Sequence, residues 1–174
     1  KEKSFSEFVG IPESDKLQVN SVKFFVDGTV QNETAYVYHQ YKQTHHYHGR
    51  KNFSQEELTE YATKLHSRGI RCHFHVMGDH AVEMAALAME KAHQVKLPDP
   101  LRHIFAHIRL ARKEDIEKLE GMEVSANFTA YSCSKDTTGK FIDGRVELIQ
   151  YPIKEFVKRN INVCYGSDWP VTDV

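Results

Sequence analysis

Short apolar runs alternate along the chain with longer segments that have a helical pattern. The runs are rich in β-branched and aromatic residues, as strands are, and cover 19–26, 70–75, 102–107, 122–128 and 161–166. A helix is expected to begin at Ser54, because Ser54 and Glu57 have the spacing of a capping box. Apolar residues then recur at helical intervals, and Gly69 is expected to end this helix.

Three more helices are expected between the later runs. Asp79 is the expected N-cap of the second helix, and the third and fourth cover 112–120 and 146–159. Residues 1–18 read as a tail or as a helix with a loop, and residues 28–53 form a polar segment too long for a routine connection. Five strands with four helical crossovers predict a parallel sheet.

The length of the chain limits the architecture that this sheet can adopt. A complete (β/α)8 barrel needs about 250 residues, whereas this chain has 174. The pattern therefore predicts a single α/β domain over residues 1–174. It leaves two architectures open, an open doubly wound sheet and a TIM-barrel fragment of about five parallel βα units.

Composition narrows the expected partners and location. The formal charge of -1 gives no electrostatic reason to expect nucleic acid or an anionic membrane as a partner. No apolar stretch approaches the roughly 20 residues needed to span a bilayer. Residues 1–4 are not followed by the apolar segment of a signal peptide. The 3 cysteines are odd in number and widely spaced, which favours a reducing compartment. We therefore expect a cytoplasmic protein.

Residues able to bind metal or carry protons follow the apolar runs. His75, His107 and Asp168 each stand at or just beyond the end of a run, where a parallel barrel places its catalytic groups. A strand histidine alone is more often a buried, hydrogen-bonded residue, and Asp168 alone is compatible with a turn. However, histidines at the ends of two successive strands, followed by an aspartate at the end of a later strand, favour a metal-binding interpretation. His73 and His103 are expected to share the faces of His75 and His107 respectively.

Lys23 lies within the first run and shares one face with Phe25 and Asp27. Most strand lysines point to solvent, but both faces of a parallel sheet are covered, which predicts a buried Lys23. A buried lysine has a depressed pKa and a nucleophilic amine. Reaction with carbon dioxide would give a carbamate, an anionic ligand able to bridge two cations.

A separate group of histidines lies in the polar segment and lacks zinc-site spacing with cysteine. We interpret it as a solvated surface loop, with a lid over the site as the alternative; its members are His39, His45, His46 and His48. Trp169 follows Asp168 directly and is a candidate pocket residue, although packing explains it equally well.

Four motifs in order resemble the amidohydrolase 3 family, a branch of the metal-dependent amidohydrolases that includes N-substituted formamide deformylase. They lie at 22–29, 75–81, 102–107 and 166–170. The resemblance implies a TIM barrel with a metal centre at its carboxyl face. The implied metal ligands are Lys23, a candidate for carboxylation, together with His75, His107 and Asp168, with Asp168 also the general base.

The resemblance also implies the chemistry. One or two divalent ions, zinc above all, would activate water to attack a small-molecule amide or formamide at a non-peptide C–N bond. Asp27 and Trp169 are the residues expected to contact this substrate.

Two departures from the family pattern shape the prediction. Ala106 stands where the family usually has Glu, and no His-x-His pair precedes Lys23. The chain is therefore expected to represent strands four to eight of the barrel, without the amino-terminal strands and β-sandwich domain. Such a fragment is expected to be inactive alone and to self-associate through its open edges. Two alternatives remain: a non-catalytic binding or regulatory module, and a free-standing open α/β protein.

Overall fold

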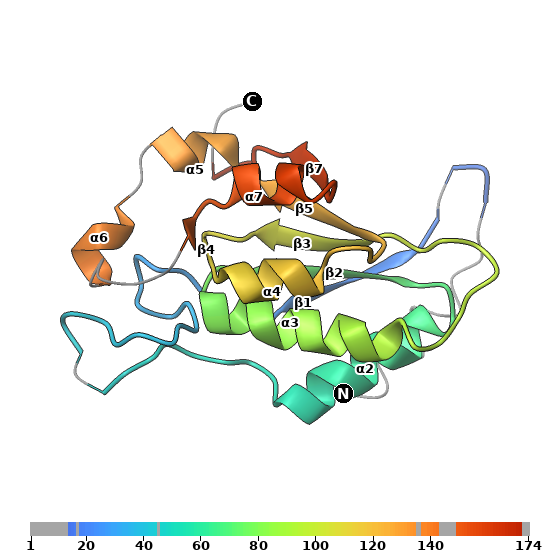
Figure 1. Ribbon diagram of the computed structural model, residues 1–174, viewed down its shortest axis with the longest axis horizontal. Coiled ribbons are helices and arrows are strands. Elements are labelled where there is room, and N and C mark those ends of the chain that lie inside the picture. Colours follow the sequence, from blue (N-terminus) through green and yellow to red (C-terminus); the bar gives the residue numbers. More distant parts are fainter. Residues whose placement is uncertain (1–13, 17, 45, 135–136, 143–148, 172–174) are drawn as a thin grey trace.

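A parallel sheet forms the centre of the computed structural model, which describes residues 14–16, 18–44, 46–134, 137–142 and 149–171 (Figure 1). The sheet has five strands in the order β1-β2-β3-β5-β7, and all neighbouring pairs are parallel. These strands are β1 (Ser21–Phe25), β2 (Arg71–Val76), β3 (His103–His107), β5 (Val124–Phe128) and β7 (Asn162–Tyr165).

Helices lie between the strands in the sequence. The four that follow the predicted pattern are α2 (Gln55–His66), α3 (Asp79–Ala92), α4 (Lys113–Lys118) and α7 (Ile153–Lys158). Two short helices, α5 (Ala130–Ser134) and α6 (Thr138–Phe141), lie between the expected strand at 122–128 and the expected helix at 146–159. In the described part of the chain, no helix combines the length and apolarity needed to cross a bilayer.

The strand order identifies the architecture. The order follows the sequence without reversal, whereas a doubly wound sheet reverses at a switch point. The helices α3, α4 and α7 lie on the same side of the sheet (Figure 1). Sequential parallel strands with helices on one side form a segment of a TIM barrel, so the barrel-fragment prediction is confirmed.

The apolar core lies between the sheet and this helix layer. Aromatic rings from adjacent strands meet there, with centroid distances of 5.5 Å for Phe24–Phe74 and 5.3 Å for Phe74–Phe105. Phe74 and Phe105 are fully buried, as is Leu58 on α2. Alternation with period two therefore places one residue in two against the helices and directs the others to the opposite face.

The first predicted helix boundary is confirmed, and the second is shifted. Ser54 accepts from the Glu57 amide and Glu57 accepts from the Ser54 amide, which completes the capping box. The second helix has Gly78 as its N-cap, and Asp79 is its first residue. The prediction that Asp79 caps this helix is wrong, because its carboxylate accepts from the Tyr38 amide instead.

The fourth helix is shorter than predicted over 146–159. Residues 146–148 lie outside the described residues, and β6 (Ile149–Gln150) pairs with β4 (Leu110–Ala111) in an antiparallel ladder. Helix α7 begins only after Pro152, which serves as its N-cap. Proline has no amide hydrogen to donate within a helix interior, so it limits the helix to the residues that follow it.

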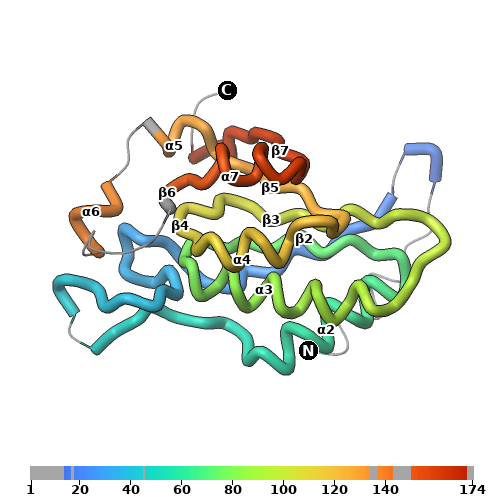
Figure 2. Tube along the Cα trace, viewed as in Figure 1, coloured from blue at the N-terminus to red at the C-terminus, as the bar shows by residue number. Residues whose placement is uncertain are grey.

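The long segment 28–53 contains no helix or strand among its described residues, but it is partly buried. Figure 2 shows it extending beyond the sheet on the side where the strands end. Val30, Ala35 and Val37 are fully buried in a second apolar cluster, which Leu110 and Ile142 complete. The solvated-loop interpretation, which concerned only the histidines, agrees with exposed His39 and His46, whereas His48 is half-buried; His45 lies outside the described residues.

His103 lies on the helix-covered face, so the prediction that it shares a face with His107 is wrong. It is fully buried in a cluster with His66 and His93. Nδ1 of His103 accepts from the Cys72 amide at 3.0 Å, which assigns its proton to Nε2. That nitrogen donates to Nδ1 of His66 at 2.9 Å, and Nε2 of His66 donates to the Val95 carbonyl.

This arrangement predicts a pH-dependent contribution of His103 to stability. Burial lowers its pKa in the folded protein to about 3, whereas an unfolded histidine titrates near 6.5. The unfolded state therefore binds the additional proton, and the stabilisation present above about pH 6.5 is lost as the pH falls. We expect His103→Asn to destabilise the protein by roughly 1–3 kcal/mol at neutral pH.

Urea unfolding at several pH values tests this expectation. The free energy of unfolding of the parent protein is expected to fall by roughly 3 kcal/mol more than that of His103→Asn between about pH 7 and pH 4, so that the deficit of the variant disappears or reverses in sign. His39→Asn, at an exposed loop position, is the matched control and is expected to parallel the parent protein. A deficit of His103→Asn that stays constant with pH would contradict the assigned protonation state.

Candidate metal centre

The sheet face opposite the helices carries the predicted site. Lys23 and His73 are register partners on β1 and β2, as are Phe25 and His75 one pair further along. Lys23 is exposed, so its predicted burial is wrong. β1 is an edge strand of the described sheet, and 57% of Phe25 on the same strand is also exposed.

Lys23 nevertheless has a specific partner in His73. Their Nζ and Nε2 atoms are 3.0 Å apart. Burial, reinforced by the charge of Lys23, lowers the pKa of His73 to about 4, so His73 is neutral near pH 7 and accepts from the ammonium group. Partial desolvation by the surrounding protein also lowers the pKa of the exposed Lys23, and the negative charge of Asp168 opposes this shift. The sequence predicted that His73 lies on this face, because it stands two residues before His75. The contact between His73 and Lys23 was not predicted.

His75 is buried near the carboxyl end of β2, and its hydrogen bond defines its tautomer. Nε2 lies 3.0 Å from the Gly28 carbonyl oxygen. A carbonyl can only accept, so Nε2 carries the proton and Nδ1 retains its lone pair. A histidine that donates one ring N–H to a backbone carbonyl while its other nitrogen is free is arranged as metal-bound histidines are.

His107 reaches the same face through an interruption of strand geometry. Its register partner is Val76, which points into the helix-covered core, so strict alternation would place His107 there too. His107 and Ile108 have φ values of 76° and 41°, and this left-handed pair redirects the side chain. The rings of His75 and His107 consequently lie 4.6 Å apart. Burial, then the neighbouring His75, lowers the pKa of His107 to about 4.

Asp168 follows the last strand and is exposed, with a φ of 55°. Its negative charge raises the pKa values of His73, His75 and His107 against the dominant effect of burial. Asp168 therefore acts electrostatically on the residues that line this face. Trp169 beside it is 73% exposed.

The side chains described on this face are of types that bind divalent metals, but too few of them converge to form a complete metal site. Imidazole nitrogen and carboxylate oxygen are the donors that zinc accepts, and His75 has Nδ1 available. Across the described ranges, however, no three His, Cys, Asp or Glu side chains converge closely enough to hold a metal ion. The described residues alone therefore do not form a complete metal site.

Asp27 has a different environment from the one predicted for a substrate contact. Its side chain is only 2% exposed. Its carboxylate accepts from the backbone amides of Tyr36 at 2.9 Å, Met77 at 3.0 Å and Gly78 at 2.8 Å. Burial raises its pKa to about 7, against these hydrogen bonds. This geometry gives Asp27 a structural role, and its contact with substrate stays a prediction.

Two glycines allow the long loop to lie against the strand ends. A Cβ atom on Gly28 would lie 2.1 Å from Oγ1 of Thr34, and one on Gly78 would lie 2.0 Å from the Tyr36 carbonyl oxygen. Asp79 adds a second attachment by accepting from the Tyr38 amide at 3.2 Å. The close packing at Gly78 joins the loop to the turn that follows His75.

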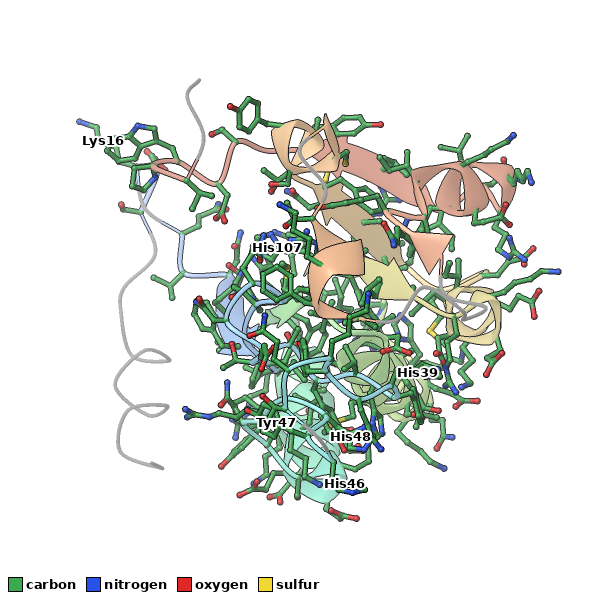
Figure 3. The ribbon with its side chains drawn as sticks, turned by 90° about the vertical axis from the view of Figure 1, so that its left-hand side faces the viewer. Lys16, His39, His46, Tyr47, His48 and His107 are labelled. Carbon is green, nitrogen blue, oxygen red and sulfur yellow. The ribbon has the colours of Figure 1, made fainter. Side chains whose placement is uncertain are left out.

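The loop histidines do not join the candidate site. Figure 3 looks onto the end of the molecule where this loop lies and shows His39, His46 and His48 well apart from His107. The sequence interpretation that separated these histidines from the metal ligands agrees with this placement.

Comparison with known proteins identifies the family of this sheet and its strand-end residues. A sequence model described as the amidohydrolase family matches residues 1–174. The Arabidopsis thaliana protein LONG AFTER FAR-RED 3 is 22% identical over 164 residues, which cover 92% of this chain and 28% of that protein.

Two solved structures share the fold. Both are uncharacterized metal-dependent hydrolases, from Pyrococcus furiosus (TM-score 0.77, 21% identity) and Pyrococcus horikoshii OT3 (TM-score 0.80, 22% identity). The match covers 99% of this chain in each case, but only 35% and 34% of the archaeal chains. The chain thus spans about a third of these structures, which are similar to it in fold.

The contact at Gly78 gives a direct test of the loop attachment. Gly78→Ala is expected to lower the free energy of unfolding by about 2–3 kcal/mol, because its methyl group overlaps the Tyr36 carbonyl. Gly139→Ala is the control, since a Cβ there meets nothing within 4 Å, and its effect is expected to stay within about 0.5 kcal/mol. Equal urea midpoints for the two variants would contradict the packing described here.

Proposed function

Because this chain belongs to the amidohydrolase family, we propose that it contributes to the active site of a metal-dependent hydrolase that cleaves a non-peptide C–N bond. The observation that carries the proposal is the pairing of His75 and His107 at adjacent strand ends, with Asp168 acting on both electrostatically. The electrostatic effect of Asp168 on Lys23 supports the same grouping. The carboxyl ends of barrel strands are the usual position of catalytic groups.

Each residue has a role in this proposal that follows from its chemistry. His75 through Nδ1, His107, Asp168 and a carboxylated Lys23 would hold one or two divalent ions, with zinc the best match to these donors. A bound ion of this kind supplies a Lewis acid that polarises a carbonyl oxygen and acidifies water.

The remaining steps belong to the protein's own side chains. Asp168 is exposed at the end of the sheet, where its carboxylate can accept a proton from water and return it to the departing amine nitrogen. His73 accepts a hydrogen bond from Lys23 and so orients the amine that would become the carbamate. Exposed Trp169 is the proposed contact for the organic part of an amide substrate.

The proposal requires additional strands beside this sheet. β1 and β7 each pair with one strand in the described sheet, whereas a closed barrel has no edges. The chain covers about a third of the archaeal structures, which supports strands from the same polypeptide as the covering of these edges. Self-association of two copies is the alternative covering.

A non-catalytic binding or regulatory module is the second candidate function. The observation that favours it is the incomplete ligand set, since no group of three His, Cys, Asp or Glu donors converges within the described residues. The two candidates differ in metal content, because the hydrolase requires bound metal and the module does not.

The full gene product that contains this chain allows the test. It is expected to release amine from a panel of formamides and small amides, to lose this activity on chelation and to regain it with Zn²⁺. Asp168→Asn is expected to reduce kcat by about 10²–10⁴-fold, because the proton acceptor is removed. Asp99→Asn, at an exposed position between two prolines, is the control and should retain activity.

Two outcomes would contradict the hydrolase proposal. One is a purified gene product that contains no metal and releases no amine, which would favour the non-catalytic module. The other is amine release that survives both chelation and the Asp168→Asn substitution.

A further inference from the structure

We propose that Asp27 is a positioning residue for His75, which it holds in the tautomer with the proton on Nε2 and the lone pair on Nδ1. The inference deepens the proposed function, since it concerns how one of the proposed ligands keeps its donor nitrogen available. It rests on three linked contacts, in which Asp27 acts through the neighbouring Gly28 and through its own charge.

The first contact fixes Asp27 itself. Its carboxylate is buried and accepts three backbone N–H groups, from Tyr36, Met77 and Gly78, at 2.8–3.0 Å. These donors come from two segments that are distant in sequence, the long loop and the turn after β2. A carboxylate with three donors aimed at it can rotate only by breaking these bonds, which would leave buried amides unpaired.

The second contact fixes the peptide that follows. The Gly28 amide donates to the Thr34 carbonyl at 3.0 Å, and the Gly28 carbonyl accepts from Nε2 of His75 at 3.0 Å. The side chain of Thr34 fills the space where a Cβ of Gly28 would lie. Held between Asp27 and Thr34, the Gly28 carbonyl has one orientation, and it faces the imidazole.

The third contact is electrostatic. Nε2 of His75 lies 3.8 Å from Oδ1 of Asp27 and 3.0 Å from the Gly28 carbonyl oxygen. Two oxygens with negative or partial negative charge therefore surround Nε2. A proton on Nε2 is attracted to both, whereas a lone pair there would be repelled by both, so the other tautomer is disfavoured.

Asp79 provides a matched comparison within the same loop. It is also a buried aspartate, and it also accepts a backbone amide of the loop, from Tyr38. No contact described for Asp79 involves Gly28 or His75. Substitution of Asp79 therefore loosens the loop without acting on the His75 tautomer.

Nitrogen NMR of the histidine-labelled protein tests the proposal, because the ring ¹⁵N shifts distinguish a protonated nitrogen from an unprotonated one. The His75 signals are assigned by their loss in His75→Gln. In the parent protein we expect Nε2 protonated and Nδ1 unprotonated. In Asp27→Asn we expect the ratio of the Nδ1-protonated to the Nε2-protonated form to rise about tenfold, and in Asp79→Asn we expect no change.

Three results would overturn the inference: a parent protein with the proton on Nδ1, an unchanged His75 in Asp27→Asn, or an equal change in Asp79→Asn. If Asp27→Asn does not fold, Gly28→Ala replaces it, since its methyl group displaces the same carbonyl against Thr34. If the His75 tautomer is unchanged in Gly28→Ala, the proposal that Asp27 acts on His75 through the Gly28 carbonyl is wrong. The measurement needs no metal, so its failure and the failure of the proposed hydrolase activity are distinguishable.

Discussion

The buried carboxylate of Asp27 is the interaction on which the candidate site depends. It joins the end of β1 to the long loop and to the turn between β2 and α3, through amides of Tyr36, Met77 and Gly78. Gly28 and Gly78 provide the close approach that these bonds require. The same attachment sets the Gly28 carbonyl against His75, so the order of the loop and the state of one proposed ligand have a common cause.

The parallel sheet separates an apolar core from a polar face. Residues such as Phe74 and Phe105 pack against the helices, while Lys23, His73 and His75 alternate with them on the other side. Among the described residues these polar side chains lie on the face opposite the helices, whereas both faces of a parallel sheet are normally covered in a complete domain. Membership of the amidohydrolase family and the coverage of about a third of the archaeal structures account for this face as the interior of a larger barrel.

Much of the fold follows from local patterns in the sequence. The capping box at Ser54 and the five apolar runs predicted the helix start and all five strands of the sheet to within a few residues. Period-two alternation also placed Lys23, His73 and His75 on one face, because β1 and β2 are regular. The barrel-like strand order needed the family resemblance or the structure, since alternation of strands and helices is common to both architectures.

The errors arose where local geometry departs from a regular period. The left-handed backbone at His107 and Ile108 turns His107 away from the face that His103 occupies, and no sequence pattern signals it. Asp79 is the first residue of α3, where a helix cap and an acceptor for a loop amide look alike in sequence. The apolar residues Val30, Ala35 and Val37 have no periodicity, so their burial depends on tertiary contacts alone.

The most direct test of the account is the location of bound metal in the full gene product. Crystals grown with Zn²⁺ would be measured at the zinc absorption edge, and anomalous scattering would locate the ion. We predict a peak at coordination distance, about 2.0–2.1 Å, from Nδ1 of His75, with His107 and Asp168 beside it. A zinc peak remote from these residues, or bound to Nε2 of His75 in place of the Gly28 carbonyl, would contradict the account.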